Sequence, residues 1–118
     1  MNYTEKVICE LIYWMEENYH QPLKIADLSR KSGYSHWYLQ RIFRQHQGES
    51  LGSYIRRRRL ERAVEELLGW NGAIEVLALK YGYDSVHTFS HVFKRAYGIA
   101  PGEWRTQNRR NLADNESR

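Results

Sequence analysis

The feature that most constrains the fold of this chain is an internal repeat, in which residues 25–48 recur as residues 74–98. The two segments read IADLSRKSGYSHWYLQRIFRQHQG and IEVLALKYGYDSVHTFSHVFKRAYG. Equivalent positions lie 49 residues apart before one residue is inserted near Asp84, and 50 apart after it. The matched pairs are Ile25 and Ile74, Leu28 and Leu77, Gly33 and Gly82, Leu39 and Phe89, Phe43 and Phe93, Gly48 and Gly98, and Tyr54 and Trp104. A repeat of this length is typical of one supersecondary unit that is used twice.

Each copy reads as two short helices joined by a tight turn. A small residue, Ser29 or Ala78, stands where a second helix must cross closely. Gly33 follows four residues after Ser29, where the chain must turn and a positive φ is tolerated best by glycine. Apolar residues then return at helical spacing in the second helix. We therefore predict two helix-turn-helix units.

The segments outside the repeat also favour helices. Residues 4–19 carry apolar side chains at helical spacing, and Thr4 is placed to cap that helix. Residues 50–68 form the longest predicted helix, and Pro101 opens a last helix whose Trp104 faces inward. The whole pattern predicts an all-α fold of about seven helices.

The repeat also sets the expected domain organisation. An N-terminal helix-turn-helix subdomain is expected at residues 1–49, a linker helix at 50–69 and a C-terminal subdomain at 70–105. From Thr106 onward the sequence is polar, TQNRRNLADNESR. Residues 106–118 are therefore predicted to be a disordered tail.

Positive charge is concentrated around the first copy. The chain has a net charge of +4, and residues 30–62 hold nine of its 18 Lys and Arg residues but only two of its 14 acidic residues. This excess points to a polyanionic partner, with a merely solvated basic face as the alternative. The single cysteine excludes an intramolecular disulfide, and no apolar run approaches the roughly 20 residues of a membrane span. No signal peptide precedes the first helix, so we expect a cytoplasmic protein without a membrane partner.

The second helix of the first copy displays side chains suited to reading DNA. Trp37, Gln40 and Arg41 lie opposite its apolar stripe, and His36 and Arg44 share that face. Arg can bond guanine in a bidentate manner, Gln can pair with adenine, and the Trp ring can contact a thymine methyl or a sugar. We predict base contacts for the first three and backbone contacts for His36 and Arg44, against the alternative that Trp37 belongs to the core.

The equivalent face of the second copy is less basic and less polar. It presents Val86, His87 and His91, with Lys94 expected at the DNA backbone. His91 stands where Arg41 stands in the first copy, and a neutral imidazole reads guanine less strongly. The second copy is therefore expected to discriminate bases less than the first.

The predicted linker helix contains four successive arginines, residues 56–59. Because successive helical residues are about 100° apart, these four side chains cannot share one face. We expect Arg56 and Arg57 to contact DNA phosphates and at least one arginine of the run to anchor inward on a carboxylate or backbone oxygen.

Metal binding and catalysis find little support in the sequence. His87 and His91 are spaced to clamp a metal, but HTFSH lacks the Glu of HExxH and no further ligands lie nearby. An alternative role for both histidines is protonation at mildly acidic pH, which would add charge at a DNA interface. No nucleophile elbow, phosphate loop or paired carboxylates appear. We expect no catalytic residue, metal or cofactor.

The segments GYSHWYLQRIFRQHQGESLGSYIRRRRL and YGYDSVHTFSHVFKRAYGIAPGEWR resemble the AraC/XylS family of bacterial transcription regulators. The resemblance covers roughly residues 4–105 and is strongest to the short, single-domain MarA/SoxS/Rob-like branch. It implies seven helices, with two helix-turn-helix subdomains joined by a rigid helix, and binding as a monomer to an asymmetric site in two successive major grooves. A linker that does not match straight DNA would bend it.

The resemblance also implies site residues and partners. It assigns base contacts to Trp37, Gln40 and Arg41 in the first copy, and in the second to Val86, His87, Thr88 and His91. Relatives usually carry Gln-Gln-Thr and a later Arg in the second copy, so a different second half-site is expected here. Double-stranded DNA and RNA polymerase are the implied partners. No small-molecule ligand is expected, because the chain has no room for the sensor domain of larger relatives.

We therefore predict a sequence-specific activator, associated with the bacterial nucleoid, for a stress or multidrug-resistance regulon. The native-looking N-terminus favours a full-length chain whose activity depends on its abundance. Two alternatives remain open: a nonspecific architectural DNA binder, and a protein-interaction module that sequesters polymerase.

Overall fold

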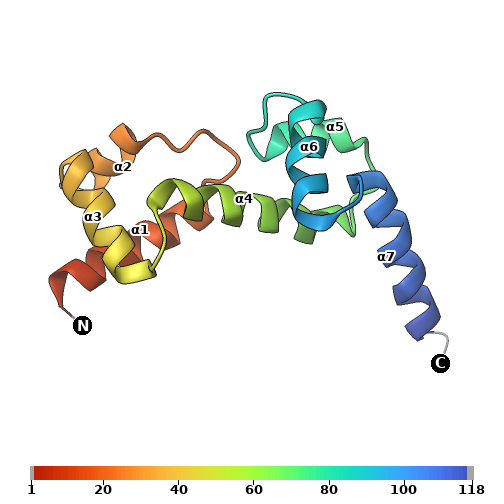
Figure 1. The fold of residues 1–118 in the computed structure, drawn as a ribbon, viewed down its shortest axis with the longest axis horizontal. Coiled ribbons are helices and arrows are strands. Elements are labelled where there is room, and N and C mark those ends of the chain that lie inside the picture. The colour runs from red at the N-terminus through yellow and green to blue at the C-terminus, as the bar shows by residue number, and fades with distance from the viewer. Residues whose placement is uncertain (1, 117–118) are drawn as a thin grey trace. The chain divides into compact units, whose positions relative to one another are not determined.

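The structure is a computed structural model that describes residues 2–116, and every regular element in that range is an α-helix (Figure 1). The helices are α1 (Tyr3–Glu16), α2 (Ile25–Ser32), α3 (His36–Gln47), α4 (Leu51–Leu67), α5 (Ile74–Lys80), α6 (Val86–Tyr97) and α7 (Pro101–Glu116). The predicted all-α class is confirmed. The chain divides into two compact units, residues 1–59 and 60–118, and the division falls inside α4.

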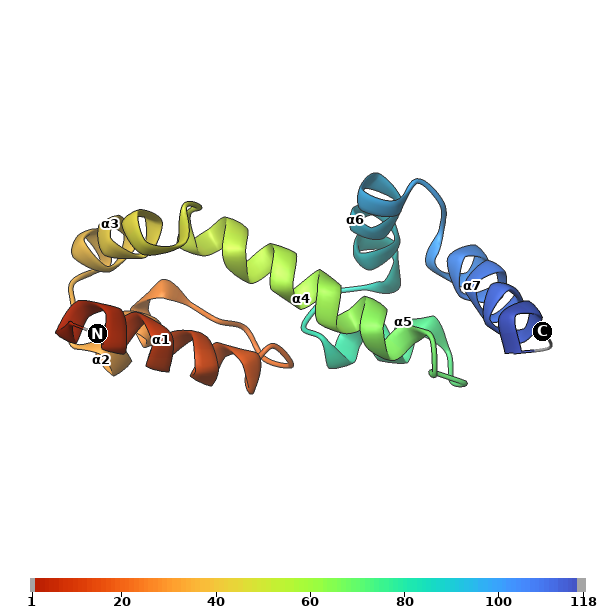
Figure 2. The same ribbon diagram turned by 90° about the horizontal axis from the view of Figure 1, so that it is seen from below.

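In the first unit, α1, α2 and α3 each pack against the other two (Figure 2). The apolar stripe of α1 points into this cluster, where Ile8, Leu28, Leu39 and Phe43 are fully buried. The start of α4 adds Tyr54, whose ring meets that of Phe43 edge to face, with the centroids 5.2 Å apart. Burial of this apolar area is the main force that holds the four helices in place.

The second unit repeats this plan with the end of α4, α5, α6 and the start of α7. Leu67, Leu77, Phe89 and Phe93 are fully buried in its core. Trp104 of α7 packs edge to face on Phe93, with the ring centroids 5.8 Å apart. This contact is the counterpart of Tyr54 on Phe43, as the sequence match of Tyr54 with Trp104 predicts.

Turns and caps recur between the two units. Gly33 and Gly82 stand in the two helix-turn-helix turns with φ of 80° and 83°, values that side chains disfavour. The N-cap serines of α3 and α6, Ser35 and Ser85, accept the N–H groups of Tyr38 and Thr88. The duplicated helix-turn-helix is thus confirmed in its turn chemistry as well as in its core.

The first helix differs slightly from the prediction. It begins at Tyr3, because the side chain of Asn2, and not that of Thr4, accepts the Glu5 N–H, at 2.8 Å. It ends at Glu16 rather than near residue 19, because the Asn18 side chain donates to the carbonyl of Trp14 at 2.7 Å. Asn and Asp side chains compete in this way with helical backbone bonding.

The prediction of a disordered tail from residue 106 is wrong as far as the structure describes it. Helix α7 continues to Glu116, and residues 117–118 lie outside the described residues. The guanidinium of Arg109 donates to the carbonyls of Leu68 and Trp70, both at 2.8 Å. These carbonyls follow α4, so a side chain beyond residue 105 completes the second unit.

The anchor formed by Arg109 has a counterpart in the first unit. Arg59 donates to the carbonyls of Tyr19 and Gln21 at 3.3 and 3.2 Å. Arg59 and Arg109 are 50 residues apart, and their acceptors are 49 apart, which are the offsets of the repeat. The repeat therefore includes an arginine that satisfies carbonyl groups after the preceding long helix.

Candidate nucleic-acid interface

Helix α3 holds its outward face in a fixed orientation. Its N-cap is Ser35, its C-cap is Gly48 in the left-handed region, and Leu39, Ile42 and Phe43 are buried beneath it. The opposite face is open to solvent, and Trp37 is 67% exposed. A tryptophan this exposed is not a core residue, so that alternative for Trp37 is wrong.

Predicted DNA-contacting residues of the first copy meet in one groove of about 470 Å³ between α3 and the start of α4. The groove is lined by Trp37, Gln40, Arg41, Arg44, Ser50, Leu51, Gly52 and Arg56. The guanidinium carbon of Arg41 lies 5.4 Å from the centre of the Trp37 ring, a cation–π contact that orients both side chains. Three guanidinium groups and no carboxylate line the groove, so it suits an anion.

His36 lies at the exposed start of α3 and does not line the groove. Ser50, Leu51 and Gly52 do line it, and no sequence pattern predicted a role for them. Ser50 accepts the N–H of Ser53 at 3.2 Å and so caps α4. A serine just before an apolar residue is the available sequence signal for this helix start.

The four successive arginines of α4 separate into distinct environments. Arg56 is exposed and reaches the groove. Arg57 instead donates from Nη2 and Nε to Oε1 of Glu49, at 2.5 and 3.1 Å. The hydrogen bond from Arg57 lowers the pKa of Glu49 below its usual value. Of the two arginines predicted to contact phosphate, Arg56 is free to do so, whereas Arg57 must first exchange its carboxylate partner.

The remaining two arginines of the run hold the first unit together. Arg58 donates from Nε and Nη2 to the two carboxylate oxygens of Glu16, at 2.9 and 3.1 Å, in a partly buried pair. Arg59 forms the carbonyl anchor described above. The expectation that at least one of the four anchors inward is thus confirmed for two of them.

The equivalent face of α6 has a different character. His87, Thr88, His91 and Lys94 are exposed, and Val86 is half-buried. The Ser85 hydroxyl is 3.2 Å from the Thr88 hydroxyl, which places Thr88 in the cap of α6. The five predicted residues share α6 with the buried Phe89 and Phe93. Among the predicted DNA-contacting residues, α6 carries one cation, Lys94, whereas α3 carries two, Arg41 and Arg44.

The structure of residues 2–116 also bears on metal binding and on membrane insertion. Residues 2–116 contain no group of three or more His, Cys, Asp or Glu side chains placed to hold a metal ion. Within the described residues, no helix is both long and apolar enough to cross a membrane.

Comparison with known proteins shows that the chain is similar to helix-turn-helix transcription regulators. A family model described as a helix-turn-helix domain matches residues 28–107. The chain is 46% identical to the regulatory protein SoxS of Escherichia coli K12 over 101 residues, which cover 86% of this chain and 94% of SoxS. It is 41% identical to the HTH-type transcriptional activator AarP of Providencia stuartii over 103 residues, covering 87% of this chain and 76% of AarP.

A solved structure gives the same result for the fold. An AraC-type transcriptional regulator from Chromobacterium violaceum superposes with a TM-score of 0.79 at 30% sequence identity. The match covers 87% of this chain and 92% of that one. Both cores and both outward helix faces therefore lie on a scaffold that DNA-binding regulators use.

Proposed function

The chain belongs to the AraC/XylS family of bacterial transcription regulators, in its single-domain MarA/SoxS-like branch, and on this premise we propose that it activates transcription from a specific, asymmetric DNA site. It is a DNA-binding regulator and not an enzyme. In our proposal a monomer inserts α3 and α6 into two successive major grooves, which lie one helical turn or about 34 Å apart.

The observation that carries the proposal is the groove beside α3. It gathers Trp37, Gln40 and Arg41, which can read base edges, with Arg44 and Arg56, which can neutralise phosphates. Guanidinium groups supply both the salt-dependent affinity and the bidentate geometry of guanine recognition. Arg41, held against the Trp37 ring, is the proposed guanine reader.

Helix α6 is proposed to read the second half of the site more weakly. Val86 offers apolar contact to a thymine methyl, and His87 and His91 each offer a single hydrogen bond. Thr88 is proposed as a further base contact and Lys94 as a phosphate contact. This combination favours a second half-site with a looser consensus than the first.

Recruitment of RNA polymerase completes the proposal. The similar protein AarP is named an activator, and activation requires a contact with the transcription machinery as well as with DNA. We place the protein in the bacterial cytoplasm, at the nucleoid, and among regulators of stress or antibiotic resistance.

Selection of bound fragments from random DNA tests the proposal directly. We expect one asymmetric motif of about two helical turns, with a stronger and a weaker half. Fragments without any shared motif, bound with steep salt dependence, would instead identify the architectural alternative.

A matched pair of variants links the motif to α3. Arg41→Ala should weaken binding to the selected site by about 1–3 kcal/mol and relax the preference at one base pair. Arg110→Ala removes the same charge from the exposed face of α7 and should leave that preference intact. If Arg41→Ala selects the same motif, the assignment of Arg41 as the guanine reader is wrong. Polymerase binding that persists without any DNA selectivity would favour the sequestering module.

A further inference from the structure

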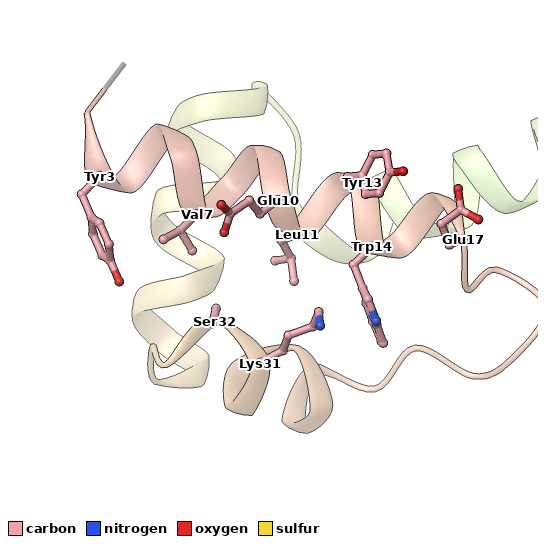
Figure 3. A pocket seen from close by; sticks show the side chains of 9 residues that line it. All are labelled: Tyr3, Val7, Glu10, Leu11, Tyr13, Trp14, Glu17, Lys31 and Ser32. Atoms are coloured by element: carbon pink, nitrogen blue, oxygen red, sulfur yellow. The ribbon is translucent and has the colours of Figure 1, made fainter.

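A second groove, of about 410 Å³, runs between α1 and α2 on the first unit (Figure 3). None of the predicted DNA-contacting residues lines it. Its volume lies within the roughly 300–1,000 Å³ typical of small-molecule sites. Its lining consists of Tyr3, Val7, Glu10, Leu11, Tyr13, Trp14, Glu17, Lys31 and Ser32.

The α1 wall of this groove is one continuous stripe. Its members alternate at spacings of four and three residues, which places them on a single helix face. They are Tyr3, Val7, Glu10, Trp14 and Glu17. The neighbouring stripe, with Ile8 and Met15, is buried in the core. That burial fixes the rotation of α1 and so holds the first stripe beside the groove, as Figure 3 shows for Val7 and Trp14.

The aromatic side chains of the groove are available to a ligand. Tyr3 and Tyr13 are each 72% exposed, and Trp14 is half-buried. The ammonium of Lys31 lies 4.9 Å from the centre of the Trp14 ring. The Trp14 face therefore already accepts a cation in this structure, through the attraction of positive charge to an aromatic quadrupole.

The charge of the groove is not balanced. Glu10 and Glu17 both line it, and neither forms an ion pair with another described residue. Lys31 is the one cation among the lining residues. The lining of the groove thus holds two carboxylates and one ammonium, in a chain whose net charge is +4. A nucleic acid would be repelled here, whereas a cation would be attracted.

We propose that the α1–α2 groove binds an organic cation that carries aromatic or branched apolar bulk. The bulk covers Val7 and Leu11, and the positive centre replaces Lys31 on the face of Trp14. Glu10 and Glu17 supply the compensating charge. This site goes beyond the proposed DNA-binding function and contrasts with the sequence-based expectation of no small-molecule ligand.

Titration with tetraphenylphosphonium tests the site, with neutral triphenylphosphine oxide as the comparison. Binding is followed by calorimetry and by the indole N–H resonance of Trp14, assigned with a Trp14→Phe variant. We expect the cation to bind about tenfold more tightly than the neutral compound, because only the cation gains the cation–π and carboxylate attractions. Equal affinities would overturn the proposal, as would a shift confined to indoles other than that of Trp14.

Two opposed variants sharpen the test. The double substitution Glu10→Gln and Glu17→Gln should weaken tetraphenylphosphonium binding several-fold, whereas Lys31→Met should strengthen it by removing the competing ammonium. Glu5→Gln, on the same helix but outside the groove, is the matched control and should change nothing. Circular dichroism confirms that each variant is folded. The opposite order of affinities contradicts a cation site. DNA affinity is measured in parallel, and its retention keeps a failure here separate from a failure of the DNA-binding proposal.

Discussion

Helices α3 and α6 occupy equivalent places in the two units, yet they present different chemistry to solvent. Both begin after a serine cap, end at a glycine in the left-handed region and bury an aromatic residue, Phe43 or Phe93. On the outward side, Arg41 in α3 stands where α6 has His91. The buried and turn positions are constrained by packing and backbone geometry, whereas the outward positions carry no such constraint and differ between the two copies.

The largest effect is expected from substitutions in the shared core. Phe43→Ala and Phe93→Ala should each destabilise the protein by about 3–5 kcal/mol, because each removes a fully buried ring and leaves a cavity. Urea denaturation followed by circular dichroism measures the change. Phe43→Leu and Phe93→Leu serve as milder versions if the alanine variants do not fold. A cost below about 1 kcal/mol for only one of the two rings would contradict equivalent packing.

The next prediction concerns substitutions on the outward faces of α3 and α6. Arg41→His should cost about 1–3 kcal/mol of affinity for the selected DNA site, since an imidazole cannot make the bidentate bond to guanine. His91→Ala should cost less, under about 1 kcal/mol, because it removes at most one hydrogen bond. Fluorescence anisotropy at constant salt measures both. A larger loss for His91→Ala would reverse the proposed ranking of the two copies.

A further prediction compares the stability contributed by the two arginine anchors, Arg59 and Arg109. Arg59→Met leaves the carbonyls of Tyr19 and Gln21 without this charged donor. Arg109→Met leaves the carbonyl of Leu68 without one, while that of Trp70 keeps Arg105. Both substitutions keep the aliphatic volume, and each should cost about 1–2 kcal/mol of stability. Arg110→Met, next to one anchor and exposed, should be nearly neutral. Thermal and urea denaturation give the comparison. If Arg109→Met behaves like Arg110→Met, the end of α7 does not hold the second unit together.

The smallest effect is expected on the first helix of each helix-turn-helix. Asp27 and Arg30 form an ion pair on α2, whereas the equivalent α5 positions are Val76 and Leu79, which are 54% and 52% exposed. Replacing the α5 pair by Val76→Asp and Leu79→Arg should change the free energy of unfolding by less than about 0.5 kcal/mol, because exposed ion pairs contribute little. A loss above about 1 kcal/mol would show that these two apolar side chains are needed for stability.

Much of the fold was predictable because local signals and the repeat agree. Gly33 and Gly48 stand at positive φ, as their places at the turn and helix end require. Trp37, Gln40 and Arg41 lie exposed on one helix, as their spacing against the buried stripe predicts. Such positions depend on helical periodicity and turn geometry, which neighbouring residues determine.

The prediction of a disordered tail from residue 106 failed because the order of this segment depends on residues far away in the chain. Residues after Thr106 have a polar composition, and no local signal in them indicates order. Their helix depends on Arg109, whose acceptors lie 39 and 41 residues earlier in the chain. Arg109 lies 50 residues after Arg59, which is the offset of the repeat and was the one available signal for an ordered segment. This signal can be interpreted only when the carbonyls that Arg59 contacts are known.

Residue patterns alone predict that this chain duplicates a helix-turn-helix and that its first copy carries the more basic outward face. The contacts of the four successive arginines depend instead on how the helices pack, with Arg56 at the groove, Arg57 on Glu49, Arg58 on Glu16 and Arg59 on backbone carbonyls. The physical reason is one of range. Periodicity and caps act within a few residues, whereas a guanidinium group takes whichever carboxylate or carbonyl the packed helices bring within reach.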